Sequence, residues 1–344
     1  MGTSRKKEFI DFFEKDRSGV HCIYDNQYLL LNDSTSIYKC AKSWIILSPT
    51  SLMSGIGDRK ECLLKSYIYD TDDTERSATD KQMLKANNFI LPEIAKAFGL
   101  EAASYGRFRI VDDFNGELGR EENIAFIRDR QPVYRLEPKK EYLLTPTFLN
   151  NNEEFMPFGD VIPNDKDHNV SNIWRQIERF LLERNISKDN IQQVRKQYVL
   201  KSIFGAFVEL NDNHNYNDGL IFTDDRSNRT VRLAPAYDLD YSMGIYNISP
   251  MGTPNRFVKI ASDGGMEVSS MLKEFDKDLT EKDLNKLLEA LDPDNIAKII
   301  YDTDKRHNLK LTIDVKHEYM TFFEEKYKEI DSFYKERYGK DIDD

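Results

Sequence analysis

A polar stretch in the second half of the chain holds the residue types that phosphoryl transfer uses. Asp212, His214 and Asn217 follow a long segment with helical spacing. Two short apolar segments, GLIF and VRLAP, come next, separated by the turn TDDRSNRT, and Asp238 stands beyond them. A carboxylate can accept the proton of an attacking hydroxyl, and an Asn with a second carboxylate can hold Mg²⁺ against a triphosphate. The order of helix, polar loop, β-hairpin and acidic residue therefore indicates phosphoryl transfer.

The spacing of these residues resembles the catalytic loop of protein kinases, in which the base and the Asn are arranged as Asp-x-x-x-x-Asn. The His-Arg that usually precedes the Asp is missing, and the tripeptide beyond the hairpin is Tyr-Asp-Leu. In these departures the chain is similar to the HipA-like serine/threonine kinases, whose loop runs roughly N-T-D-x-H-x-K-N and whose metal segment runs L-x-P-x-Y-D. The matching segments here are Asn211–Asn217 and Leu233–Asp238.

The resemblance implies a role for each matched residue. Asp212 would be the catalytic base, Asn217 and Asp238 would be the Mg²⁺ ligands, and His214 would brace the loop. The implied function is ATP- and Mg²⁺-dependent phosphorylation of Ser or Thr hydroxyls on a protein, with autophosphorylation, in a toxin–antitoxin setting with an antitoxin as partner. Two alternatives stay open: a pseudokinase that acts as a nucleotide-binding regulatory module, and a small-molecule kinase on the same fold.

A kinase also needs a lysine on a strand to hold the α- and β-phosphates, and Lys65 in the apolar segment ECLLKSY is the candidate. A surface lysine whose stem lies along apolar neighbours is the competing interpretation. The position expected for its acidic partner holds Asn88, which leaves Glu93 and then Glu75 as substitutes.

The phosphate-binding loop is predicted from a Gly-x-Gly that precedes this lysine. Ser54, Gly55 and Gly57 form it, and the Ser- and Thr-rich segment 33–36 is the other candidate. A simple turn at residues 54–57 is the competing interpretation, because the full GxGxxG pattern is missing.

Apolar periodicity predicts the elements that must position these residues. Strands are expected at 21–31, 42–48, 61–69, 107–111 and 123–129, and a helix at 81–100 has Gly99 where a C-cap belongs. Further helices are expected at 170–185, 187–210, 279–291, 293–304 and 318–339. We therefore predict an α+β, two-lobed protein-kinase-like fold, with an N-terminal extension (1–20), a small β-rich N-lobe (21–130) and a larger helical C-lobe (131–344).

Composition narrows the function classes. The 344 residues carry a formal net charge of −11, which argues against nucleic-acid binding through bulk charge. The sequence has no apolar run of the roughly 18 residues that a membrane span needs, and its first residues lack the apolar core of a signal peptide, so a cytoplasmic protein is expected. The three cysteines are far apart, which argues against a disulfide framework. The five histidines show no HExxH spacing, which argues against a zinc enzyme.

Overall fold

The structure is a computed structural model that describes residues 9–24, 28–31, 42–47, 60–66, 77–111, 141–150, 152–162, 170–210, 217–225, 228–243 and 267–339. Contacts divide the chain into two compact units. The first, here the sheet unit, comprises Met1–Ser77, Ala103–Phe148 and Arg306–Asn308. The second, here the helical unit, comprises Ala78–Ala102, Leu149–Lys305 and Leu309–Asp344.

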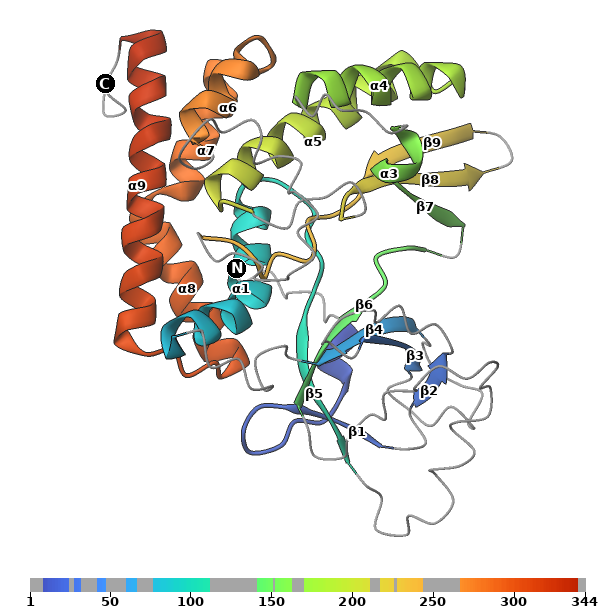
Figure 1. Cartoon of the computed structure of the whole chain (residues 1–344), viewed down its shortest axis with the longest axis vertical. Helices are drawn as coiled ribbons and strands as arrows, with labels where there is room; N and C mark the ends of the chain where they lie inside the picture. Colours follow the sequence, from blue (N-terminus) through green and yellow to red (C-terminus); the bar gives the residue numbers. More distant parts are fainter. Residues whose placement is uncertain are drawn as a thin grey trace, which may run out of the picture. The chain divides into compact units, whose positions relative to one another are not determined.

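The sheet unit is built on a six-stranded sheet with the strand order β1-β5-β6-β4-β3-β2 (Figure 1). All neighbouring strands pair antiparallel except β1 and β5, which are parallel. The short 3-10 helix η1 (Phe9–Phe12) precedes the sheet. The strands are β1 (His21–Tyr24), β2 (Tyr28–Leu31), β3 (Lys42–Leu47), β4 (Lys60–Ser66), β5 (Gly106–Val111) and β6 (Glu141–Pro146).

One face of this sheet carries the core of the unit. Residues on alternate positions of a strand share a face, and Cys62 and Leu64 of β4 lie on the same side as Phe108 and Leu144. Residues of and after η1 complete the cluster, so that the sheet is covered on this side. The buried cluster is Ile10, Phe13, Ile23, Leu47, Cys62, Leu64, Phe108, Tyr142 and Leu144.

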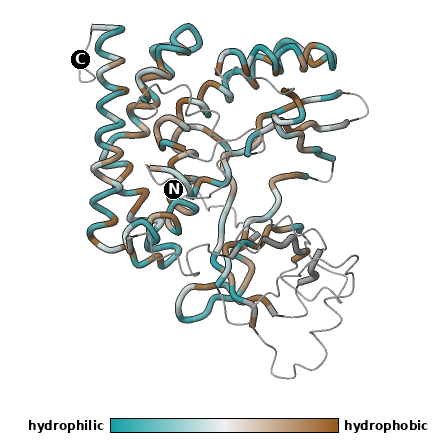
Figure 2. Tube along the Cα trace, in the orientation of Figure 1, coloured by the Kyte–Doolittle hydropathy of each residue, from teal (hydrophilic) through white to brown (hydrophobic). Residues whose placement is uncertain are grey.

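The helical unit combines long helices with a three-stranded antiparallel sheet of order β7-β8-β9. Helix α9 runs alongside α6 and α7 (Figure 1), and hydrophobic and hydrophilic residues alternate along α4 and α9, as burial on one side requires (Figure 2). The strands are β7 (Glu153–Pro157), β8 (Gly219–Asp225) and β9 (Asn228–Leu233). The helices are α1 (Ala78–Ala97), α3 (Phe158–Val161), α4 (Val170–Glu183), α5 (Lys188–Phe207), α6 (Val268–Glu274), η6 (Asp276–Asp278), α7 (Glu281–Leu291), α8 (Pro293–His307) and α9 (Ile313–Tyr338).

The ends of the helices follow local chemistry that the sequence carries. Gly99, two residues past α1, has a φ of +86°, the left-handed conformation that glycine adopts without cost, which confirms it as the C-terminal stop. Ser187 accepts a hydrogen bond from the backbone N–H of Asn190 and caps α5. Pro92 lies inside α1, which nevertheless continues to Ala97.

The predicted α+β composition is confirmed, with β-rich and helical units, while several elements differ from the prediction. β6, β7 and α6 are not among the predicted elements. β6 lies in the middle of the sheet although it is a six-residue segment that ends in a proline.

The predicted strand 123–129 and the predicted boundary between residues 130 and 131 lie outside the described residues. From the sequence, α1 is expected in the N-lobe, whereas by contacts it groups with the helical unit, because it packs against α7 and α9. Among the described helices, none is both long and apolar enough to cross a membrane.

Candidate functional site

Three of the residues predicted for the site, Lys65, Asn217 and Asp238, are among those that the structure describes. The other five predicted residues lie outside the described part of the chain: Asp212, His214, Ser54, Gly55 and Gly57.

The β8–β9 hairpin brings Asn217 and Asp238 to the same end of one structural element. Asn217 lies just before β8 and Asp238 shortly after β9. Leu220 pairs with Leu233, and the backbone N–H of Ala234 donates to the carbonyl of Gly219 at 2.9 Å. The hairpin thus joins the two chain segments that carry the predicted metal ligands.

The start of β8 lies close against β7. A Cβ at Gly219 would stand 2.3 Å from the carbonyl oxygen of Met156, so only glycine fits at this position. The carbonyl of Asp218 also accepts a hydrogen bond from the backbone N–H of Phe158 at 2.9 Å. This strand start is therefore held from the β7 side by backbone contacts.

On the α5 side, Lys201 binds both the residue that precedes β8 and the residues that follow β9. Its Nζ donates to Asp218 Oδ1 at 2.8 Å, and to the carbonyls of Ala234 and Pro235 at 2.9 and 3.0 Å. Nζ also lies 5.8 Å from the centre of the Tyr237 ring, in cation–π range. The three N–H bonds of the ammonium match the three oxygen acceptors.

The Lys201–Asp218 pair is shielded from solvent, with side-chain exposures of 13% and 9%. Burial raises the pKa of Asp218, while the Lys201 ammonium and the N–H of Gly219 oppose that rise by stabilising the carboxylate. Asp218 Oδ1 accepts from Gly219 at 2.8 Å, so one oxygen serves both the side-chain pair and the strand start.

Three hydrogen bonds to backbone groups hold the segment that carries Asp238. The N–H of Ala236 donates to the carbonyl of Glu101 at 2.8 Å. Further along, the side chain of Asn87 donates to the carbonyl of Asp240 at 2.9 Å, and the N–H of Met243 donates to the carbonyl of Val208 at 2.8 Å. The segment 234–243 is therefore attached to Val208, directly after α5, and to residues in and after α1.

Asp238 has a φ of +53° within this segment. A left-handed backbone is uncommon for a residue with a side chain, and the residues on both sides must impose it. The side chain of Asp238 is half-buried. Asp adopts this conformation more readily than most residues, and five other described non-glycine residues share a positive φ, so the assignment of Asp238 rests on the sequence motif.

Helix α9 supports this arrangement through α1. The Tyr319 hydroxyl lies 2.5 Å from Asn87 Oδ1, and both residues are fully buried. The Asn87 amide is thus oriented by Tyr319 on one side and bound to the carbonyl of Asp240 on the other.

A small cavity of about 20 Å³ lies beside the hairpin. Its polar lining includes Lys201, Asn217, Asp218 and Tyr237. A volume of this size holds about one water molecule. Asn217 thus borders the same space as the Lys201–Asp218 pair.

The donor chemistry of Asn217 and Asp238 fits a hard divalent cation. An amide oxygen and a carboxylate are ligands that Mg²⁺ accepts, and Mg²⁺ in nucleotide sites takes only a few ligands from the protein. Among the described residues, no three His, Cys, Asp or Glu side chains gather into a metal site of another type.

Lys65 is buried, with 8% of its surface exposed. It pairs with Leu143 in the register of β4 and β6, and lies on the face of the sheet opposite to the one that carries Cys62 and Leu64. The competing interpretation of Lys65 as a surface lysine does not fit this burial.

Of the residues considered as acidic partner of Lys65, Asn88 and Glu93 lie in α1 and have contacts within that helix. Asn88 is buried in α1, where its side chain donates to the carbonyl of Leu84 at 3.1 Å. The Glu93 carboxylate pairs with Lys96 of the same helix at 2.8 Å. Glu75 is outside the described part of the chain.

Three residues near the site were missed from sequence: Lys201, Asp218 and Asn87. Lys201 had a signal, since it is the one charged residue in the run YVLKSIFGAFV of α5. Asp218 looked like an ordinary turn residue because it precedes a glycine. Asn87 had no signal, because its partners are distant in sequence.

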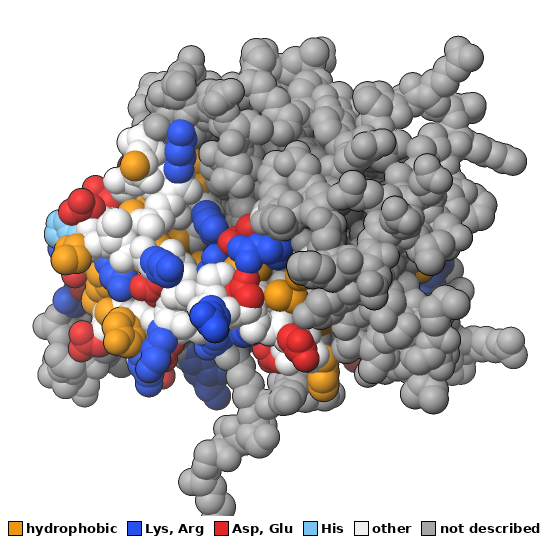
Figure 3. All heavy atoms as spheres, turned by 90° about the horizontal axis from the view of Figure 1, so that it is seen from below, with side chains coloured by type: hydrophobic (Ala, Val, Ile, Leu, Met, Phe, Trp, Pro, Cys, Tyr) orange, Lys and Arg blue, Asp and Glu red, His pale blue; other side chains and the backbone are white. Residues whose placement is uncertain are grey.

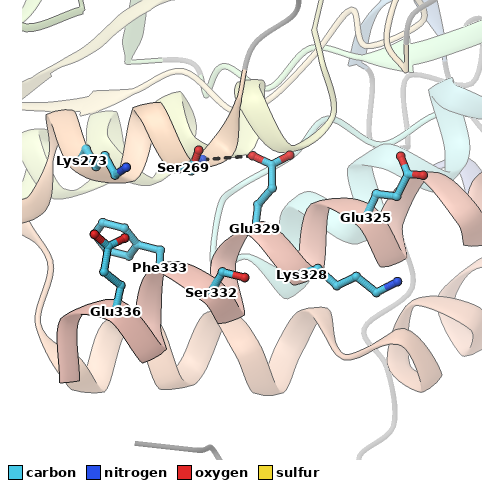
Figure 4. A pocket seen from close by; sticks show the side chains of 8 residues that line it. All are labelled: Ser269, Lys273, Glu325, Lys328, Glu329, Ser332, Phe333 and Glu336. Atoms are coloured by element: carbon cyan, nitrogen blue, oxygen red, sulfur yellow. Dashed lines mark hydrogen bonds between the residues drawn. The ribbon is translucent and has the colours of Figure 1, made fainter. Parts of the chain in front are cut away.

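A larger hollow of about 310 Å³ lies between α6 and α9, away from the hairpin residues (Figure 4). The N–H of Ser269 donates to the Glu329 carboxylate at 3.2 Å there, and Lys273 and Lys328 stand among three glutamates. Its lining mixes lysines with glutamates and also includes Phe333.

Comparisons with known proteins gave matches only among solved structures. No protein-family model matches the sequence, and no curated protein matches it. The chain is similar to the proinflammatory kinase CtkA of Helicobacter pylori, with a TM-score of 0.46 and 11% identity over 85% of this chain and 93% of that one. It is also similar to HipA of a Shewanella oneidensis MR-1 toxin–antitoxin system, solved with HipB and operator DNA, with a TM-score of 0.38 and 10% identity over 91% of this chain and 67% of that one.

Proposed function

We propose that this chain is an ATP- and Mg²⁺-dependent phosphotransferase that phosphorylates Ser or Thr hydroxyls on a protein. One observation carries the proposal: Asn217 and Asp238, two oxygen ligands suited to Mg²⁺, are held at the same end of the β8–β9 hairpin. Asp212 precedes Asn217 at the spacing of a kinase catalytic loop.

In this proposal, each of five predicted site residues has a distinct task. Asn217 and Asp238 would hold the cation, and Asp212 would accept the proton of the attacking hydroxyl. Lys65 would place its ammonium against the phosphates, and His214 would orient the loop. When bound, Mg²⁺-ATP supplies the phosphoryl group with its charge partly neutralised.

The motif resemblance to HipA-like kinases extends the proposal to autophosphorylation and to an antitoxin as partner. Autophosphorylation has a direct readout, because each transferred group adds the mass of one phosphoryl group to the intact protein. An antitoxin partner would be tested by co-purification of the chain with the product of a neighbouring reading frame.

The central test is phosphoryl transfer from labelled ATP with Mg²⁺, with and without a cell extract. Asp212→Asn is expected to lower transfer by about 100-fold or more, the usual scale for a lost general base, while ATP binding remains. Asp238→Ala is expected to abolish Mg²⁺-dependent ATP binding in calorimetry. The matched control Asp302→Ala changes an exposed carboxylate of α8 and should alter neither quantity.

The outcomes separate the competing functions. Equal ATP affinity of wild type and Asp238→Ala in the presence of Mg²⁺ would contradict the metal role. Nucleotide binding without any transfer would favour the regulatory module. Transfer to small hydroxyl compounds but to no protein would favour the small-molecule kinase.

A further inference from the structure

We infer that Lys201 is a positioning residue: its ammonium, paired with Asp218, fixes the segment that carries Asp238 against the segment that carries Asn217. This inference rests on the proposed function for its catalytic consequence. Its structural content, the attachment of one segment to the other, can be tested without any activity.

The contacts of Lys201 span both sides of the hairpin. One of its three hydrogen bonds goes to the side chain beside Asn217, and the other two go to the carbonyls of Ala234 and Pro235 that lead into the Asp238 segment. A single cation therefore links the two segments that carry the proposed ligands. Its ring contact with Tyr237 reaches the residue directly before Asp238.

Because the Lys201–Asp218 pair is buried, loss of one partner should lower the stability of the protein. Removing one charge from a shielded pair leaves the other uncompensated, which destabilises a protein more than removal of the whole pair. A purely structural ion pair and a positioning pair thus differ in one respect. When both charges are removed, stability should recover in either case, but only a purely structural role lets activity recover with it.

The segment has other attachments beyond Pro235. Ala236 is bound to Glu101, Asp240 to the side chain of Asn87, and Met243 to Val208. These contacts hold the segment to α1, to the chain that follows α1 and to the end of α5, and none of the three is made to Asn217. Lys201 and the Ala234–Gly219 hydrogen bond are, by contrast, direct links between the two ligand-bearing segments.

The test compares three variants with wild type. The first is Lys201→Met, and the second adds Asp218→Asn, which keeps an acceptor for the Gly219 N–H. The control is Arg195→Met, on the same helix, which removes an ion pair with Asp278 of η6. The measurements are the melting temperature, kcat and KM for Mg²⁺-ATP, and hydrogen exchange of peptides that cover residues 234–243.

We expect Lys201→Met to melt at a lower temperature than the double variant, which should recover more than half of the loss. The double variant should still exchange faster over 234–243 and keep kcat at least tenfold below wild type, since a small displacement of catalytic groups costs up to about 100-fold. Arg195→Met should leave kcat and that exchange unchanged.

Recovery of both exchange and kcat to wild-type values in the double variant would overturn the inference. If Lys201→Met fails to fold, the double variant alone decides. If wild type transfers no phosphoryl group, the proposed function fails, and exchange still decides: faster exchange in the double variant supports the attachment, and unchanged exchange overturns it.

Discussion

His21 shows how burial alters the acid–base behaviour of a single residue. Its imidazole stacks on the Phe108 ring with centroids 4.8 Å apart, and its Nδ1 lies 3.1 Å from the carbonyl of Phe13. Burial, aided by the nearby Lys15 charge, lowers the pKa of His21 to about 4. The ring is therefore neutral in the folded sheet unit at neutral pH.

This lowered pKa predicts a loss of stability on the acid side. The unfolded chain binds a proton at His21 near pH 6.5, whereas the folded chain does so only near pH 4, so stability is full above pH 6.5 and falls as the pH drops between these values. The loss should amount to about 3 kcal/mol of unfolding free energy. Denaturant titrations at several pH values measure it.

His21→Phe keeps a stacking ring and should remove most of this pH dependence. The control His317→Phe replaces an exposed histidine of α9 and should fall in stability as steeply as wild type. A His21→Phe protein that loses as much stability as wild type between pH 6.5 and 4 would show that other groups cause the loss.

Helix α1 acts as a link between α9 and the segment after the hairpin. Asn87 uses both ends of its amide, one toward Tyr319 and one toward the carbonyl of Asp240. A buried polar group that keeps both hydrogen-bond partners has a fixed orientation. Loss of one partner leaves a buried amide atom without a hydrogen bond, which lowers stability.

Tyr319→Phe is expected to lower the unfolding free energy by about 1–3 kcal/mol, because it removes the donor from buried Asn87 Oδ1 without creating a large cavity. Chemical denaturation gives the value. The control Tyr301→Phe changes a tyrosine of α8 that is 61% exposed and should shift stability by less than about 0.5 kcal/mol. Equal effects of the two substitutions would argue against the proposed link.

At the scale of the whole molecule, the net charge bears on whether the protein binds polyanions. The net charge is −11, and on the face shown in Figure 3 the Lys and Arg side chains of the described residues are interspersed with Asp and Glu. A polyanion binds strongly only where cations gather and release its counterions.

We therefore expect the purified protein to pass a heparin column without retention at about 0.15 M salt. Basic nucleic-acid binders are still retained at this salt concentration. Wild type and the charge-neutral pair variant Lys196→Gln with Asp283→Asn should elute together, since neither net charge nor a basic surface changes. Elution of wild type only at much higher salt would reveal a basic surface that the net charge conceals.

The sequence alone determined the elements whose signals are local. The helix ends at Gly99 and Ser187 follow from the residues at those positions. The β8–β9 hairpin follows from two apolar segments around a turn, and it is what relates Asn217 to Asp238. Such signals lie within a few residues of the structure that they specify, so a single sequence is sufficient to find them.

Only the tertiary structure decided the surroundings of the site. β6 becomes a central strand because β4 and β5 pair with it from both sides, and Lys65 is buried because of its register in that sheet. Lys201 meets Asp218 from 17 positions away, and Asn87 reaches the carbonyl of Asp240 from 153 positions away. Contacts at such separations depend on how whole elements pack against one another, and no local pattern of residue types encodes them.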